Sequence, residues 1–228
     1  MAADLAILFH GRGLLAVDKP SGVSVHRGLD GASDTIVARL RALGIEGARP
    51  VHRLDRPTSG VLLCALSSEM AAICGQAFAE RRPDKTYLAL VRGLCPIEAL
   101  IDHPVPSDED GPRVAARTLV RRVEAVTIED SLLKERRYSL VRAEPETGRF
   151  HQVRRHLKHI GHPIVGDTTY GRSEHNRLCA ERFGLRRLAL HAASLSIALA
   201  DPDGAVTIEA PLPIDLRAPL RSMGFSLL

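Results

Sequence analysis

The sequence predicts an α+β protein with a mainly antiparallel sheet. Segments with the alternating or β-branched pattern of strands outnumber segments with helical periodicity, and short turns connect several of them. Short connections favour antiparallel pairing, because a parallel pair needs a long crossover. No internal repeat or low-complexity linker divides the 228 residues, so we expect a single domain over 1–228.

Each expected element follows from its own local pattern. Strands are expected at 14–19, 61–67, 86–91, 138–144, 188–199 and 205–210. The last two flank an Asp-Pro-Asp-Gly sequence, which favours a hairpin. Helices are expected at 34–43, 68–80, 147–160 and 214–224, with Asp34 and either Ser67 or Ser68 as N-caps. The segment 103–113, rich in proline and acidic residues, is expected to be a surface loop.

The overall composition is that of an ordinary globular protein. Hydrophobic residues make up 45% and charged residues 25% of the chain, which argues against a disordered protein. No run of eighteen apolar residues occurs and the N-terminus lacks a basic start, so we expect no membrane span, no signal peptide and a cytoplasmic location. The four cysteines form no Cys-x-x-Cys pair, and buried free thiols are expected.

Positive charge is concentrated in one part of the chain. The formal net charge is +4, yet residues 149–187 alone contain nine Lys or Arg and three Asp or Glu. Such a concentration indicates an anionic partner, and nucleic acid is the usual one. A basic surface that serves only solubility is the competing interpretation.

The segment VHRLDRPTSG at 51–60 is the most informative for chemistry. It is polar and leads directly into an apolar strand, and Pro57 forbids a regular helix through it. Asp55 is therefore expected in a rigid turn at the edge of a strand, with Arg53 and Arg56 beside it. Nearby cations favour an ionised carboxylate, which a nucleophile or base needs at neutral pH. A structural aspartate paired with arginine is the alternative.

The segment 147–167 is expected to form a helix with one apolar stripe. Arg154 lies on the shoulder of that stripe, where an unpaired charge is costly, so Arg154 needs an anionic partner. His151, His156, His159 and His162 also lie here, and a zinc site that includes His156 and His159 is the alternative. No Cys lies close by and the dense Arg and Lys repel a cation, so we expect no metal.

Two further segments suggest contacts with a nucleotide. Tyr87, in KTYLALVRG, is one of only three tyrosines, and its ring is suited to stack on a base, although a core tyrosine is the simpler interpretation. Lys19, in the turn of DKPSGVSVH, offers a positive charge to phosphate, but this signal is weak alone.

Taken together, these segments resemble the RluA-type pseudouridine synthases. DKPSGVSVH, HRLDRPTSG, KTYLALVRG, TGRFHQVRRH and LALHAASLSI match successive motifs of that family, in order, over roughly 12–210. The resemblance implies the pseudouridine synthase fold, in which helices and loops flank a mainly antiparallel mixed sheet. We expect no S4-like RNA-binding module before the matched part. The implied activity is isomerisation of uridine to pseudouridine in RNA, without metal or organic cofactor.

The resemblance also implies roles for individual residues. Asp55 is the implied catalytic carboxylate, with Arg154 paired to it and Tyr87 stacked on the target base. Whether Asp55 acts as a nucleophile or removes the C2′ proton stays open. The remaining implied contacts to the substrate come from Arg53, Arg56, Lys19, Arg149, His151, Gln152 and Leu190.

The implied substrate is tRNA, at a uridine like that of position 65, with rRNA as the alternative. Arg56-Pro57 and the stretch from His175 to Ala192 resemble family members that act on tRNA. We expect the protein to work as a monomer. Outside this family, a non-catalytic RNA-binding protein and a metal-dependent hydrolase are the rival interpretations.

Overall fold

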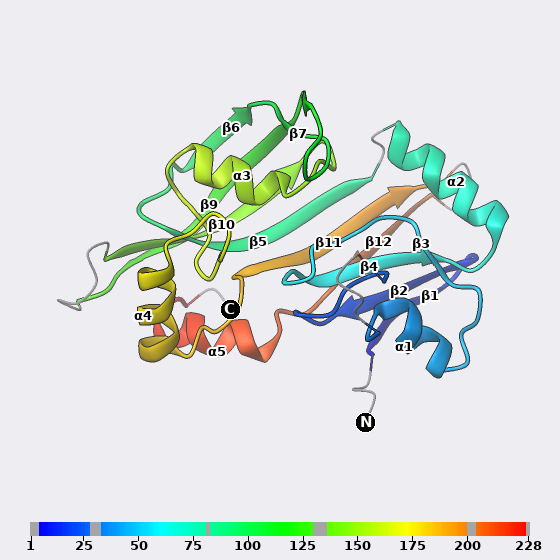
Figure 1. Ribbon diagram of the computed structural model, residues 1–228, viewed down its shortest axis with the longest axis horizontal. Coiled ribbons are helices and arrows are strands. Elements are labelled where there is room, and N and C mark those ends of the chain that lie inside the picture. The colour runs from blue at the N-terminus through cyan, green and yellow to red at the C-terminus, as the bar shows by residue number, and fades with distance from the viewer. Residues whose placement is uncertain (1–4, 28–32, 81–82, 130–135, 200–203, 227–228) are drawn as a thin grey trace. The chain divides into compact units, whose positions relative to one another are not determined.

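A computed structural model describes residues 5–27, 33–80, 83–129, 136–199 and 204–226, and the chain divides into two compact units (Figure 1). The first unit comprises Met1–Lys85 and Ala192–Pro211, and the second comprises Thr86–His191 and Leu212–Leu228. The chain therefore leaves the first unit, builds the second, returns to the first and ends in the second.

The first unit has a sheet with strand order β1-β2-β4-β11. β12 pairs with β11 and β3 pairs with β4. Its strands are β1 (Ile7–Gly11), β2 (Leu14–Lys19), β3 (Arg49–Pro50), β4 (Ser59–Ala65), β12 (Ala205–Glu209) and, from Ala192 onward, β11 (Leu190–Ala198). Its helices are α1 (Ile36–Ala42) and α2 (Ser68–Ala79).

The central strand of the first unit is β4, which is buried along its whole length. It pairs antiparallel with β2, and leucine, valine and cysteine fill both of its faces. A strand that is covered on both sides has a continuous apolar run rather than an alternating one. Leu63 packs in a core with Leu14, Ile197 and Ile208, so residues far apart in sequence hold this unit together.

The second unit has a sheet with strand order β5-β10-β9-β6, and each of these pairs is antiparallel. Its strands are β5 (Asp84–Arg92, from Thr86 onward), β6 (Glu98–Asp102), β9 (Arg117–Thr127) and β10 (Arg137–Pro145), with a separate hairpin of β7 (Val105–Pro106) and β8 (Arg113–Val114). Its helices are α3 (Gln152–His159), α4 (Ser173–Phe183) and α5 (Ile214–Ser222).

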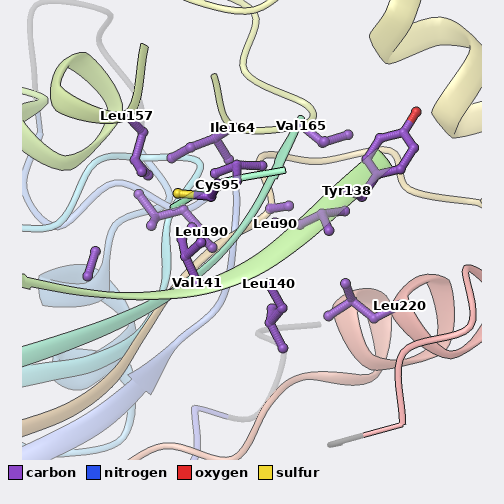
Figure 2. Packing of buried hydrophobic residues seen from close by; sticks show 14 of the residues in the cluster. Leu90, Cys95, Tyr138, Leu140, Val141, Leu157, Ile164, Val165, Leu190 and Leu220 are labelled. Carbon is purple, nitrogen blue, oxygen red and sulfur yellow. The ribbon is translucent and has the colours of Figure 1, made fainter. Parts of the chain in front are cut away.

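Helices cover the sheet of the second unit on both faces (Figures 1 and 2). Leu140 and Val141 are neighbours on β10, and their side chains point to opposite faces of the strand. Leu157 of α3 and Leu220 of α5 are both fully buried in the same core as these residues. This two-sided packing fixes α3, the helix that contains Arg154.

The predicted fold class is confirmed, and most predicted strands occur close to their expected bounds. The hairpin of β11 and β12 is present, with Ala198 opposite Ala205, although its turn lies outside the described residues. All four cysteines are buried and free, as expected. Ser67 caps α2, but α1 is capped by Thr35, because Asp34 instead forms a bidentate pair with Arg39.

Other features also differ from what the sequence predicts. The helix predicted at 147–160 begins only at Gln152, because His151 has a left-handed backbone with φ 52°. The segment expected to be a loop at 103–113 contains most of the β7–β8 hairpin. α4 was not predicted, because only His175 and Cys179 of this polar helix are buried. Among the described residues, no helix is long and apolar enough to span a bilayer.

Candidate active site

Asp55 lies in a tight turn that a neighbouring loop holds in place. The Thr58 amide donates to the Asp55 carbonyl at 3.0 Å, which closes the turn around Pro57. From the loop after β2, the Gly22 amide donates to the Arg56 carbonyl at 2.8 Å and the Ser21 hydroxyl donates to the Pro57 carbonyl at 2.7 Å. The predicted turn is therefore confirmed, and its backbone is fixed from outside.

Lys19 is held inside the protein. Its side chain is fully buried, and its ammonium donates to the carbonyls of Pro20 at 3.0 Å, Val23 at 2.7 Å and Arg56 at 3.1 Å. An ammonium group has three donors. These contacts join the two loops, and the contact of Lys19 with phosphate stays a prediction.

The turn leads into β4 through Gly60, a glycine that the fold requires. Its φ is +111°, and a Cβ at this position would collide with the backbone of Ala192 on β11. Only glycine allows both this conformation and this close approach. The Ser59-Gly60 end of the motif therefore serves the packing of the sheet that positions Asp55.

His52 supports the same segment as a neutral acceptor. The Leu63 amide donates to His52 Nε2 at 3.0 Å, and the His52 ring stacks on Phe78 of α2 at a centroid distance of 5.4 Å. Burial, together with the nearby Lys85 ammonium, lowers the pKa of His52 to about 4. Burial likewise lowers the pKa of Lys85 to about 8. His52 thus stays uncharged at neutral pH.

The side chains beside Asp55 are positively charged and accessible. Arg53 and Arg56 are exposed, and Asp55 is half-buried. Arg56 is partly anchored, since its Nε donates to the Gly22 carbonyl at 3.0 Å. The first unit therefore presents a carboxylate of fixed backbone position, flanked in sequence by two arginines.

Arg154, in the second unit, forms a buried bidentate ion pair with Asp167. Its Nε donates to Asp167 Oδ2 at 2.8 Å and its Nη2 to Oδ1 at 2.9 Å, and Nη2 also donates to the Thr169 hydroxyl at 3.1 Å. The prediction that Arg154 needs an anionic partner is confirmed. A fork-to-fork pair fixes the plane of the guanidinium as well as its position.

Several groups keep the Asp167 carboxyl ionised. Burial raises its pKa, but the Arg154 guanidinium and the amides of Tyr170 and Thr169 outweigh burial, so the net shift is downward. Both amides donate to Asp167 Oδ1 at 2.9 Å. Asp167 was not predicted as a site residue, although it is the first acidic residue after the helix.

α4 fixes the loop that contains Asp167. Asn176 Nδ2 donates to the Asp167 carbonyl at 2.9 Å, and the Gly166 amide donates to Asn176 Oδ1 at 3.0 Å. Gly166 has φ +79°, and a Cβ there would collide with the Arg187 backbone. The helix that the sequence did not reveal therefore positions the partner of Arg154.

Gln152 is a scaffold residue rather than an accessible one. It is buried, and its Oε1 accepts from the Thr147 hydroxyl at 2.6 Å and the Arg149 amide at 3.0 Å. Its Nε2 donates to the Arg117 carbonyl at 2.9 Å and the Thr118 hydroxyl at 3.0 Å. These bonds use the whole carboxamide, and they hold 147–151 in a conformation that is not helical.

The remaining predicted residues of the second unit occupy different environments. His151 caps α3 without a side-chain capping bond, and its Nδ1 lies 3.0 Å from the Tyr170 hydroxyl. Arg149 is half-buried. Tyr87 lies on β5 opposite Ala143 and packs partly against the core, and Leu190 is buried in that core.

Two histidines of α3 have other partners within the protein. Both ring nitrogens of His156 are used, by the Thr118 hydroxyl at 2.8 Å and the His103 carbonyl at 2.9 Å. His159 instead stacks on His103 at a centroid distance of 3.7 Å. Among the described residues, no group of three or more His, Cys, Asp or Glu is arranged to hold a metal ion.

The candidate residues thus fall into two sets. Asp55, Arg53, Arg56 and Lys19 belong to the first unit, whereas Tyr87, Arg149, His151, Gln152, Arg154 and Leu190 belong to the second. A family model described as RNA pseudouridylate synthase matches residues 13–159, a stretch that includes parts of both units. The chain belongs to the RNA pseudouridylate synthase family.

This pseudouridine synthase has close curated relatives in bacteria. It is 41% identical over 208 residues to tRNA pseudouridine synthase C of Haemophilus ducreyi, covering 83% of both chains. It is 43% identical over 206 residues to tRNA pseudouridine synthase C of Pasteurella multocida, covering 84% of both chains. The predicted RluA-type resemblance is therefore confirmed.

Solved structures agree with the family assignment. Human RNA Pseudouridylate Synthase Domain Containing 1 matches with a TM-score of 0.77 at 28% identity, over 96% of this synthase and 89% of that chain. Human RNA Pseudouridylate Synthase Domain Containing 4 matches with a TM-score of 0.74 at 26% identity, over 96% and 92%. The pairing of Asp55 with Arg154, which belong to different units, stays a prediction.

Proposed function

We propose that this pseudouridine synthase isomerises a uridine of tRNA, at a position equivalent to 65, with Asp55 as its catalytic carboxylate. One observation carries the tRNA assignment. Over most of its length the chain is about 40% identical to several proteins named tRNA pseudouridine synthase C. The Arg56-Pro57 pair and the stretch from His175 to Ala192 support the same choice.

The reaction needs a fixed carboxylate more than it needs a cofactor. The C1′–N1 glycosidic bond breaks, the uracil turns, a C1′–C5 bond forms, C5 loses its proton and N1 gains one. Nothing is oxidised or hydrolysed. Asp55 either attacks the nucleotide covalently or removes the C2′ proton, and its tight turn limits the reorientation that each route would require.

The other residues have roles that match their environments. Arg154 pairs with the Asp55 carboxylate, and its bond to Asp167 sets the orientation in which it does so. Tyr87 stacks on the target base and Leu190 packs near it. Arg53 and Arg56 hold the flipped nucleotide, whose extraction from the stack costs a few kcal/mol. Arg149 and His151 contact the RNA, while Lys19 and Gln152 act as positioning residues.

The two units act together as a single catalytic domain, and the enzyme works as a cytoplasmic monomer without metal or cofactor. An rRNA substrate is the second candidate, because the family resemblance extends to synthases of ribosomal RNA. A non-catalytic RNA-binding protein has less support, since Asp55, Tyr87 and Arg154 are all present.

One experiment separates these possibilities. The protein is incubated with unmodified tRNA transcripts and with rRNA fragments, and pseudouridine is mapped at single-nucleotide resolution. We expect it in tRNA, at uridine 65. Pseudouridine in rRNA alone would overturn the tRNA assignment while leaving the reaction class intact, and no pseudouridine in either RNA would overturn the activity itself. A tRNA in which uridine 65 is replaced by cytidine is the matched substrate control.

A further inference from the structure

A group of basic and aromatic side chains surrounds the N-terminal end of α3 and the adjoining loop. We call it the cation–aromatic cluster and define it by Arg149, Arg155, Lys158, Phe150, His151 and Tyr170. Arg149, Arg155 and the three rings are half-buried, and Lys158 is exposed. All six residues belong to the second unit.

Aromatic rings fix the position of Arg155. Its guanidinium carbon lies 5.6 Å from the centroid of Phe150 and 5.2 Å from that of Tyr170. Tyr170 is in turn held by His151, whose Nδ1 lies 3.0 Å from the tyrosine hydroxyl. A guanidinium stacked on rings has lost much of its rotamer freedom before a ligand arrives, so binding costs less conformational entropy.

Positive charge in the cluster exceeds the negative charge available to it. Tyr170 has Arg154 at 5.0 Å, Arg155 at 5.2 Å and Lys158 at 5.6 Å from its ring centroid. The Asp167 carboxylate already forms an ion pair with Arg154. In the part of the chain that the structure describes, no carboxylate forms an ion pair with Arg149, Arg155 or Lys158.

Two donors of the cluster are also unused. The Nε–H groups of Arg149 and Arg155 are buried and meet no acceptor among the described residues. Buried polar groups nearly always have a partner, and exceptions call for an explanation. A small rearrangement of either side chain on arrival of an anion would use Nε together with a terminal nitrogen, the geometry in which guanidinium binds phosphate.

We propose that Arg155 and Lys158, together with Arg149, bind a backbone phosphate of the RNA, with Tyr170 and Phe150 holding Arg155 in place. A phosphodiester supplies the negative charge that the cluster lacks and oxygens that match a guanidinium fork. This inference rests on the proposed function, since it assumes that RNA is the substrate, and it extends RNA contact to Arg155, Lys158 and Tyr170.

Binding measurements on matched variants test the proposal. Affinity for unmodified tRNA is measured across a salt series for wild type, Arg155→Gln, Lys158→Gln and Arg155→Lys. Arg217→Gln is the control, because Arg217 is an exposed arginine of α5 that also belongs to the second unit and loses the same charge. Thermal unfolding of each variant checks that the fold is intact.

We expect Arg155→Gln to raise Kd for tRNA roughly 5–20-fold, whichever bases flank the modified uridine. The slope of log K against log salt should become shallower by about 0.7–0.9, the contribution of one phosphate. Lys158→Gln should have a smaller effect, Arg155→Lys an intermediate one, and Arg217→Gln none. The loss in turnover should appear in KM rather than in kcat.

The outcomes separate this inference from the proposed function. If wild type forms pseudouridine but Arg155→Gln binds tRNA as Arg217→Gln does, the phosphate site is wrong and the enzyme assignment stands. Arg155→Gln could weaken tRNA binding and its salt dependence as expected while wild type forms no pseudouridine. The phosphate site would then stand and the proposed reaction would be wrong. A fall in kcat at unchanged KM and Kd would show that Arg155 only supports Arg154.

Discussion

Arg154 and Asp167 form a bidentate ion pair at 2.8 and 2.9 Å, and both side chains are almost fully buried. The pair joins the first turn of α3 to the loop that α4 anchors through Asn176. The arginine assigned to the chemistry is therefore oriented by a carboxylate thirteen residues further along the chain. Disturbing either partner should affect both the stability of the fold and the orientation of the guanidinium.

Asp167→Asn should destabilise the protein by about 3–5 kcal/mol, because it leaves the Arg154 charge buried without a full counter-charge. The folded state lowers the pKa of Asp167, so the pair contributes stability above the unfolded value near 4 and loses it as pH falls further. Urea unfolding between pH 3 and 7 measures this. If the free energy of unfolding falls equally with pH in wild type and variant, the ion pair does not contribute to stability as described.

Arg154→Lys should lose most of its activity although the charge is kept. A lysine cannot reproduce the two parallel bonds to Asp167 or the bond to the Thr169 hydroxyl. Arg154→Ala should be impaired at least as severely, because it also leaves the Asp167 carboxylate buried and unpaired. Single-turnover rates on tRNA compare the two variants. Wild-type rates in Arg154→Lys would show that orientation of the guanidinium is unimportant.

Asp55→Asn should abolish pseudouridine formation, with a fall of more than about 1,000-fold in rate, while affinity for tRNA is largely retained. Asparagine keeps the shape of the side chain, and the turn is held by backbone bonds from Gly22 and Thr58 that the substitution leaves in place. The measurement is single-turnover formation beside a binding titration. Appreciable turnover would remove Asp55 from its assigned role.

His52 should make stability depend on pH in mildly acidic solution. Its pKa is lowered from 6.5 to about 4 in the folded protein, so the neutral ring is favoured by folding. Stability is therefore complete above pH 6.5 and is lost as pH falls toward 4, by roughly 2–3 kcal/mol. His52→Gln keeps an acceptor for the Leu63 amide but does not titrate, and it should flatten the curve. If wild type and His52→Gln lose stability equally as pH falls, His52 is not the cause of the pH dependence.

Exhaustive treatment with EDTA should leave activity unchanged. His156 already uses both ring nitrogens inside the protein, and His159 stacks on His103. The proposed reaction requires neither a Lewis acid nor a redox centre. Turnover on tRNA before and after chelation is the measurement, and activity that is lost on chelation and restored by zinc would revive the metal hypothesis.

Local sequence patterns were sufficient to predict several strands, the turn that contains Asp55 and the family of this protein. Apolar alternation and β-branched residues predicted β2, β5 and β10, since strand formation depends on a period that is visible within a few residues. Pro57 and the polar residues around it predicted the turn that contains Asp55. The five motifs and their order along the chain were sufficient to indicate the family.

Only the tertiary structure decided which groups the polar side chains of these segments contact. Lys19 and Gln152 are polar side chains that the sequence placed at the substrate. The fold buries both, with Lys19 donating to the carbonyl of Val23 and Gln152 donating to the Thr118 hydroxyl of β9. Asp167 became the partner of Arg154 because α4 holds its loop there. A local pattern fixes the conformation of a segment, whereas the partner of a long charged side chain depends on where distant segments pack.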